Sequence, residues 1–179
     1  MRPPRLPALF VLFLAMACNR PGETGSGSPL GAMPTFEYES TGGCSNFIVY
    51  TTNKGPTEVL VVSADVDRLG IKQGRTTLDI ESAPKDLSVT IQLYPRPQKH
   101  LHLCTDFTDP ESDKSVVWTA VGGKIIIEKF APDPRPEGTM PTFRVKVTVE
   151  DAVFHDVLGR SAKCPHAIVL DSTVGWVPG

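Results

Sequence analysis

The clearest structural signal in this sequence is the segment TFRVKVTVE, which runs from Thr142 to Glu150. Apolar side chains occupy every second position, with polar or charged side chains between them. Successive side chains of a β-strand point to opposite faces, so this alternation predicts a strand with one face in the core and the other in water. Leu87 to Leu93 alternates in the same way, and Pro95 and Pro97 then end the predicted strand.

Two shorter apolar runs, Phe47–Tyr50 and Val59–Val62, are rich in β-branched residues. Continuous runs of this kind predict strands that are buried on both faces. The segment between them, Thr51–Thr57, contains Asn, Gly and Pro, and therefore predicts a hairpin loop.

Two adjacent glycines, Gly122 and Gly123, separate the runs Ser115–Val121 and Lys124–Phe130. Glycine adopts the positive φ angles of a type I′ turn without steric cost, so this pattern predicts a tight hairpin. The following segment, Ala131–Pro141, contains four prolines and predicts an exposed connection that is neither strand nor helix.

Weaker patterns complete the prediction. Further strands are expected at Thr76–Ile80, Lys99–Cys104, Ala167–Leu170 and Val174–Val177, and a single helical turn at Asp65–Leu69. About seven to nine short strands without an amphipathic helix indicate an all-β fold, specifically an antiparallel β-sandwich that is immunoglobulin-like in general architecture. We assign this domain to residues 35–179.

The N-terminus has the organisation of a signal peptide. Arg2 and Arg5 precede the apolar run Ala8–Ala17, and small residues stand at the third and first positions before Cys18. Ten residues span about 15 Å as a helix, which is half the thickness of a bilayer core, so the run is too short for a permanent anchor. Residues 1–17 are therefore predicted to be a signal peptide.

The sequence Ala-Met-Ala-Cys at residues 15–18 resembles the signal-peptide end of bacterial lipoproteins, in which the Cys becomes the lipidated N-terminus. The resemblance implies a protein of the bacterial cell envelope that is attached to a membrane through acyl chains such as palmitate on Cys18. Asn19, in place of Asp, favours the outer membrane over the inner by the sorting rule of that family. The match departs at Ala15, where the family prefers Leu and this chain has Leu14 one place earlier.

Ala-x-Ala also suits ordinary signal cleavage, which would leave Cys18 unmodified. The segment that follows, Asn19 to Pro34, contains Gly25-Ser26-Gly27-Ser28 and few residues that could be buried, so it predicts a flexible tether. A lipid at the tip of such a tether has an evident use, and we therefore expect residues 18–34 to be the lipidation site and tether. Three further stretches, Gly43–Tyr50, Cys104–Phe107 and Val174–Gly179, resemble uncharacterised envelope lipoproteins, a likeness that implies no activity.

The chain has four cysteines: Cys18, Cys44, Cys104 and Cys164. With Cys18 lipidated, three remain in an oxidising compartment, which predicts one disulfide and one free thiol. Loop entropy does not select the pair, because closing about 60 or about 120 residues differs by only about 0.6 kcal/mol. We favour Cys44–Cys104, since Cys44 precedes one strand-like run and Cys104 ends another. Pairings of Cys164 with either of these remain the alternatives.

The pattern His100-Leu101-His102-Leu103-Cys104 is the strongest candidate for a metal site. On a strand, His100, His102 and Cys104 would share one face, and imidazole with thiolate suits zinc or copper. Alternatively, the two leucines face the core, the histidines face water and Cys104 is in a disulfide. We favour this second interpretation and expect no metal or other cofactor.

Other arrangements carry less chemistry. The acidic residues Asp106, Asp109, Glu111 and Asp113 lack the spacing and the Gly of an EF-hand. In Cys164-Pro165-His166 adjacent side chains of an extended chain point apart, so no nucleophile–base pair is implied. There is no Gly-x-Ser-x-Gly motif. The sequence therefore does not predict an enzyme.

Charge narrows the class of partner. The chain has 18 Lys and Arg against 20 Asp and Glu, and Arg2 and Arg5 would be removed with the signal peptide. The mature domain is therefore mildly acidic. Because nucleic-acid binding needs a basic surface, no nucleic acid is expected as a partner. We expect a lipid-anchored envelope protein with a non-catalytic binding or structural role. It would contact an envelope protein or surface ligand through the loops Thr105–Lys114 and Ala131–Pro141. The alternatives are metal binding through His100 and His102, or an enzyme without a recognisable motif.

Overall fold

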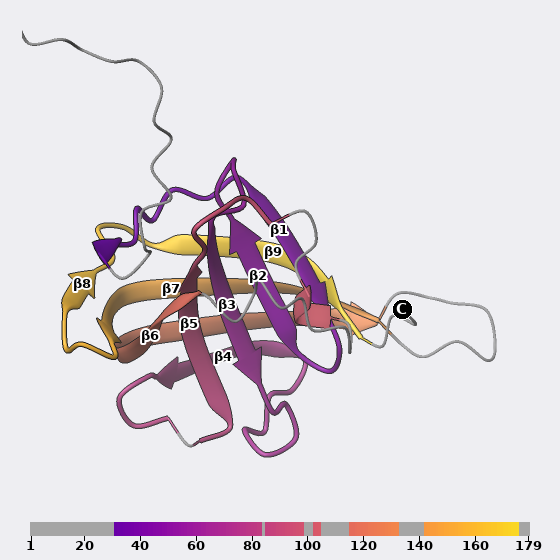
Figure 1. Ribbon diagram of the computed structural model, residues 1–179. Helices are drawn as coiled ribbons and strands as arrows, with labels where there is room; N and C mark the ends of the chain where they lie inside the picture. Colours follow the sequence, from indigo (N-terminus) through magenta and orange to yellow (C-terminus); the bar gives the residue numbers. More distant parts are fainter. Residues whose placement is uncertain (1–30, 84, 99–101, 105–114, 133–141, 176–179) are drawn as a thin grey trace, which may run out of the picture.

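The computed structural model describes residues 31–83, 85–98, 102–104, 115–132 and 142–175, and of His102 only the backbone (Figure 1). These residues form β1 (Ser40–Cys44), β2 (Ile48–Thr52), β3 (Glu58–Ala64), β4 (Gly74–Asp79), β5 (Leu87–Leu93), the short 3₁₀ turn η2 (His102–Cys104), β6 (Val116–Pro132), β7 (Phe143–Asp156), β8 (Ser161–Lys163) and β9 (Ile168–Val174). The predicted signal peptide, Cys18 and the predicted tether up to residue 30 lie outside the described residues.

The nine strands belong to one antiparallel sheet. The strands β1, β2, β3, β5, β6, β7 and β8 follow one another in it, while β4 pairs with β6 and β9 pairs with β7. The expected all-β, antiparallel fold is confirmed. β5 has the bounds that its alternation predicted, and the predicted β2–β3 hairpin is present, with the side chain of Asn53 accepting hydrogen bonds from the Thr57 and Glu58 amides at 2.9 and 3.1 Å.

The sheet curls over itself until it is nearly barrel-shaped. In Figure 1, β1, β2, β3 and β5 form a front layer, and β4, β6, β7 and β9 cross behind it. The curl brings β9 beside β1, where the Thr41 hydroxyl donates to the Asp171 carbonyl (2.9 Å) and the Gly175 amide donates to the Ser45 carbonyl (2.8 Å). The path from β1 through β2, β3, β5, β6 and β7 to β9 contains seven strands, and β4 and β8 branch from it. Because antiparallel neighbours alternate in direction, an odd number of strands leaves β1 and β9 parallel where they meet.

The predicted tight turn at Gly122 and Gly123 is wrong. β6 runs without interruption through both residues, and its register with β7 shifts on either side of Gly122. Gly123 has φ of 111°, and a Cβ there would lie 2.7 Å from main-chain atoms of Glu150 and Ala152. The glycines therefore form a β-bulge, which bends and twists a strand. This bend lets the β6–β7 hairpin belong to both layers.

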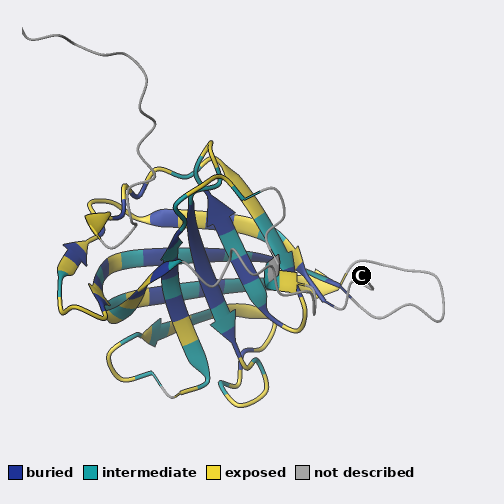
Figure 2. Cartoon of the chain, viewed as in Figure 1, coloured by how far each residue is buried: buried dark blue, intermediate teal, exposed yellow. Residues whose placement is uncertain are grey.

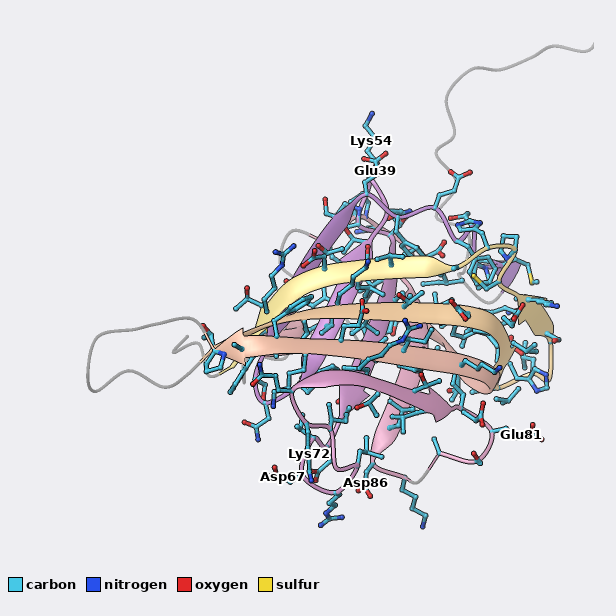
Figure 3. All side chains as sticks on the ribbon, turned by 180° about the vertical axis from the view of Figure 1, so that it is seen from behind. Glu39, Lys54, Asp67, Lys72, Glu81 and Asp86 are labelled. Carbon is cyan, nitrogen blue, oxygen red and sulfur yellow. A yellow bond between two sulfur atoms is a disulfide. The ribbon has the colours of Figure 1, made fainter. Side chains whose placement is uncertain are left out.

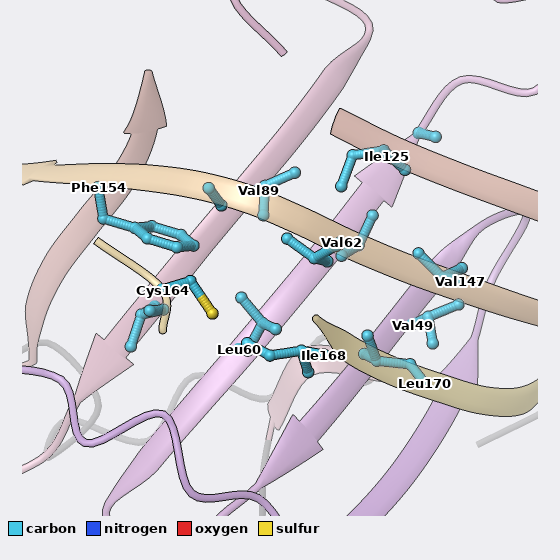
Figure 4. Close-up of a cluster of buried hydrophobic side chains, with 14 of the residues drawn as sticks. Val49, Leu60, Val62, Val89, Ile125, Val147, Phe154, Cys164, Ile168 and Leu170 are labelled. Carbon is cyan, nitrogen blue, oxygen red and sulfur yellow. The ribbon is translucent and has the colours of Figure 1, made fainter. Parts of the chain in front are cut away.

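The core lies between the two layers, as Figure 2 shows for the inner faces of the strands. The apolar positions of β7 point inward, with Val145, Val147 and Val149 fully buried, while Arg144 is exposed, as the alternation predicted. Figure 4 shows Val147 among side chains of the opposite layer; the residues labelled there are Val49, Leu60, Val62, Val89, Ile125, Val147, Phe154, Cys164, Ile168 and Leu170. Each fully buried Val, Leu or Ile contributes about 1.5–3 kcal/mol.

Two further predictions need correction. A strand was expected over Lys99–Cys104, but its last three residues, His102–Cys104, form the 3₁₀ turn η2. β5 ends at Leu93 opposite Glu58, whereas Cys104 is bonded to Cys44 at the other end of β1, so the chain between must travel the length of the sheet. The predicted connection 131–141 is also shorter than expected at its start, since β6 extends to Pro132. The rest of that connection and Trp176–Val177 lie outside the described residues.

Candidate functional site

A cavity of about 690 Å³ opens at one end of the curled sheet, where β3 and β9 end and β5 and β7 begin. Its floor is apolar and buried, since Phe47 and Val174 are 2% exposed and Ala64 is 7% exposed. Its rim is charged, and the charged residues are Asp65, Asp67, Lys85, Asp86 and Lys129. We call this end of the domain the cavity end.

The predicted helical turn at Asp65–Leu69 forms part of this rim. The Leu69 amide donates to the Asp65 carbonyl (3.0 Å), and the Arg68 amide donates to Asp65 Oδ1 (3.1 Å). The Arg68 side chain bridges two carboxylates, with Nε 3.4 Å from Asp65 Oδ2 and Nη1 3.2 Å from Asp86 Oδ1. Its side chain is 71% exposed, so these ion pairs are screened by solvent.

On the opposite side of the cavity, Lys129 of β6 lies over the ring of Phe143 of β7. The Nζ atom is 4.3 Å from the ring centroid, which is within the range of a cation–π interaction. The cavity thus presents three carboxylates and Lys85 on one side and an ammonium group held over an aromatic ring on the other. Such a rim can contact a partner that carries both charges.

The disulfide Cys44–Cys104 is confirmed. The two Cα atoms are 5.7 Å apart, within the range that a disulfide spans. The bond joins the end of β1 to η2 at the cavity end, next to the Asn46 and Phe47 backbone that lines the cavity. Cys164 is the free cysteine among the described residues, as predicted.

Cys164 is buried in the core beside Phe154 (Figure 4). Its thiol donates to the carbonyl of His166 at 2.9 Å, and burial raises the pKa of the thiol above its usual value. Cys164 is therefore held as a neutral thiol, and its contact is with the His166 backbone, not with an imidazole base. It acts as a small apolar core residue.

The candidate metal ligands lie largely outside the described residues. His100 is not described, and of His102 only the backbone is. The expectation that His102 and Cys104 share a strand face is wrong, because η2 is a 3₁₀ turn and side chains there do not alternate. The sulfur of Cys104 is in the disulfide and is not a thiolate ligand. The acidic residues of the loop 105–114 also lie outside the described part of the chain.

The opposite end of the domain is organised around a buried carboxylate, Glu58, which is 2% exposed at the start of β3. Its two oxygens accept four hydrogen bonds: from the Thr35 amide (2.8 Å) and hydroxyl (2.7 Å), the Phe36 amide (3.0 Å) and the Tyr38 hydroxyl (2.8 Å). Within the described residues no Lys, Arg or His forms an ion pair with it. We call Glu58 and these three residues the Glu58 clamp.

The clamp fixes the chain where it enters the domain. Phe36 is buried with φ of 60°, and its ring centroid lies 5.9 Å from that of Phe154. Burial, together with the adjacent charge of Glu58, raises the pKa of the Tyr38 hydroxyl far above its usual value, so Tyr38 remains a hydrogen-bond donor. The residue that follows the predicted tether, Thr35, is thereby held in place. We call this end of the domain the tether end.

The tether end and the cavity end are at opposite ends of β3, which begins at Glu58 and ends at Ala64. Figure 3 shows the same separation in side chains, with Glu39 and Lys54 at one end and Asp67 and Asp86 at the other. The sheet is the rigid spacer between them.

The described side chains of the cavity include one hydroxyl nucleophile, Ser63, and no His. Across the described residues no group of three or more His, Cys, Asp or Glu is placed to hold a metal ion. The same residues also contain no helix of sufficient length and apolarity to span a membrane.

Sequence reasoning missed the Glu58 clamp and the cavity. A Glu directly before the fully apolar run Val59–Val62 was a usable signal, since a carboxylate at the start of a buried strand needs partners. Its partners lie 20 to 23 residues earlier, in a segment without a recognisable pattern. The cavity could not be anticipated because its lining comes from β3, β6, β7 and β9 and from the loops between strands.

Comparison of the chain with models of protein families, with curated proteins and with solved structures finds no match in any of the three.

Proposed function

We propose that this protein is an exported, lipid-anchored binding module of the bacterial cell envelope with a non-catalytic role. The lipid on Cys18 would hold it to a membrane, with the outer membrane favoured by Asn19. The cavity end would contact an envelope protein or a surface ligand. The observation that carries this proposal is the separation of the two ends: the chain enters at the tether end, and the cavity opens at the other.

The tether supports such an arrangement. Residues 18–34 are rich in Gly and Ser, and a flexible chain of that length has a root-mean-square extension of about 20–25 Å. Pro34 is already buried and the Glu58 clamp holds Thr35, so the chain is fixed to the domain from these residues onward. A domain held at one end in this way presents its other end outward.

The fold proposal follows from the same geometry. We infer that the two layers act as the sheets of an immunoglobulin-like β-sandwich joined through the β6–β7 hairpin. This inference is supported by the core, on which the inner faces of both layers pack. The two layers are also joined by hydrogen bonds into a single sheet, whereas the two sheets of a sandwich need not be.

The anchor is tested by mass measurement of the mature protein. We expect an acylated N-terminus at Cys18 in the wild type, and a soluble species in the Cys18→Ser variant. Two acyl chains or more would retain the protein stably on a membrane, whereas one would not. An unmodified thiol at Cys18 in the mature wild type contradicts the anchor.

The contact site is tested by placing a photo-crosslinking amino acid at Asp67 or, as the matched control, at Glu39. Both are exposed acidic residues, and Figure 3 places them at opposite ends of the domain. In envelope preparations we expect Asp67 to yield a discrete crosslinked species and Glu39 not to. Equal crosslinking from the two positions, or crosslinking from Glu39 alone, contradicts the assignment of the cavity end.

A further inference from the structure

The outer face of the back layer carries rows of side chains that alternate in charge across its strands. One row is Arg75 of β4, Glu128 of β6, Lys146 of β7 and Asp171 of β9, which follow one another in the registers of the three strand pairs. A second row, four residues further along β4, is Asp79, Lys124 and Glu150. Between them lies an uncharged row of Thr77, Ile126, Thr148 and Val169. Opposite charges directly across strands stabilise a sheet.

Both charged rows stop at β4, which pairs with β6 alone. Figure 1 and Figure 3 show β4 as the outermost strand of the back layer. Arg75, Thr77 and Asp79 are exposed, and neither Arg75 nor Asp79 forms an ion pair with any described residue. Arg75 and Asp79 therefore have an oppositely charged cross-strand neighbour on β6 but none on the other side of β4 among the described residues.

Apart from the Asp79 carbonyl, which accepts a hydrogen bond from the Ser82 hydroxyl at 3.5 Å, the outward-facing backbone groups of β4 have no hydrogen-bond partner among the described residues. The Ile80 amide donates to the Gly123 carbonyl of β6 at 2.9 Å. Hydrogen-bonded residues alternate along an antiparallel strand, so the amides and carbonyls of Thr76 and Leu78 face β6, and those of Arg75, Thr77 and Asp79 face away. An edge of this kind is a template for another strand.

We propose that β4 pairs with β4 of a second copy of this chain, antiparallel and centred on Thr77, to form a symmetric dimer with a continuous back layer. Arg75 and Asp79 are each two residues from Thr77, so this register puts Arg75 of each copy opposite Asp79 of the other. Both charged rows then continue across the dimer axis with their signs alternating. An isologous contact requires this self-complementarity.

Other pairings do not satisfy the charges. A parallel pairing in register would place Arg75 beside Arg75, and an antiparallel pairing centred between Thr76 and Thr77 would place Arg75 opposite Leu78. An unrelated strand would meet an exposed Arg and Asp, which is how natural edges discourage pairing. The edge is therefore selective for its own copy.

A hollow beside Asp79 supports the same occupant. It has a volume of about 350 Å³ and is lined by Asp79, Glu81, Asp151 and Lys124, so carboxylates outnumber the cation. The guanidinium of Arg75 from the second copy would enter this acidic surrounding. Arg suits such a place because its planar donors engage carboxylates in pairs.

The dimer is tested by analytical ultracentrifugation of the mature chain carrying Cys18→Ser. We expect concentration-dependent dimerisation in the micromolar range, and at least a tenfold rise in Kd for Thr77→Lys, which places two ammonium groups opposite each other at the axis. The matched control is Thr148→Lys, in the same uncharged row but two strands from the edge. It should leave Kd within about twofold of the wild type.

A charge exchange sharpens the test. Arg75→Asp or Asp79→Arg alone should each weaken the dimer, and the double exchange should recover most of the affinity, while thermal melts confirm that every variant is folded. Thr77→Cys should also form an interchain disulfide on oxidation, because paired Cα atoms would be about 5.5 Å apart, and Thr148→Cys should not. A wild type that stays monomeric at high micromolar concentration overturns the proposal, as does a dimer that is indifferent to Thr77→Lys.

Discussion

The two ends of this domain are held by different chemistry. At the tether end the buried carboxylate of Glu58 accepts hydrogen bonds from four donors and has no cationic partner among the described residues. At the cavity end a disulfide closes β1 onto η2, and the surrounding charges are exposed ion pairs. Beside the clamp the hollow next to Phe36 and Tyr38 has a volume of only about 250 Å³, whereas the disulfide fixes the frame covalently next to the larger cavity of about 690 Å³. This difference is expected if one end fixes the chain and the other makes contacts.

The largest expected effect is the loss of the disulfide at the cavity end. The Cys44→Ser, Cys104→Ser double variant removes a crosslink with a sequence separation of 60 residues, which in the chain-entropy model stabilises by about 4 kcal/mol. Denaturant unfolding should show a loss of roughly this size. Hydrogen exchange should show lowered protection first near Cys44 and Phe47, with the Glu58 clamp still protected below the global transition. Equal loosening of both ends would contradict the division between them.

The second largest effect is expected at the tether end. Glu58→Ala leaves the buried amide of Phe36 and the partly buried donors of Thr35 and Tyr38 without their acceptor, and the domain should lose about 3 kcal/mol of unfolding free energy. The matched control is Glu128→Ala, which removes a half-exposed Glu 4.0 Å from Lys146 and should cost less than about 0.5 kcal/mol. If the two variants unfold alike, the clamp does not hold the tether end.

Alkaline pH should weaken the tether end selectively. The pKa of Tyr38 is raised in the folded state, chiefly by burial, so its contribution is complete below the unfolded value of about 10 and is lost as pH rises above it. Cys164, whose pKa is also raised, adds a loss that begins near pH 8.5. Tyr38→Phe should cost about 1 kcal/mol at neutral pH and flatten the decline of stability above pH 10. Tyr50→Phe is the control, and an unchanged slope in Tyr38→Phe would count against the clamp.

The parts of this structure that could be predicted from sequence depend on local patterns. Period-two alternation identified β5 and most of β7. The disulfide was predicted correctly, but only Cys44 has the strand context on which the prediction was based, because Cys104 ends the 3₁₀ turn η2. The double glycine was misread because the same residues suit a turn or a bulge. The choice is made by β7, whose backbone at Glu150 and Ala152 approaches Gly123.

The candidate site was harder to predict because its residues are brought together by the fold and form no local pattern. The partners of Glu58 come from a segment without periodicity, and the cavity is assembled from residues as far apart as Asn46 and Gly175. The edge of β4 carries no signal by itself either. Its charges acquire a meaning only when the register with β6 shows which row each of them continues.

The smallest effect on stability is expected for the exposed ion pairs of the cavity rim. Arg68 bridges Asp65 and Asp86 on the cavity rim, but its side chain is 71% exposed, and exposed ion pairs contribute about 0–1 kcal/mol. Arg68→Ala should therefore lower the unfolding free energy by less than about 1 kcal/mol, and the difference should shrink further at high salt.

A double-mutant cycle of Arg68→Ala with Asp86→Ala measures the coupling directly, and it should be at most a few tenths of a kcal/mol. Arg68→Ala frees the carboxylates of Asp65 and Asp86 but leaves the disulfide-linked strands in place. It should therefore change the yield of crosslinking from Asp67 while leaving the unfolding free energy nearly unchanged. A coupling energy as large as the loss of unfolding free energy expected for Glu58→Ala would mean that the ion pairs of the cavity rim stabilise the fold as the clamp does. The contrast between the two ends would then fail.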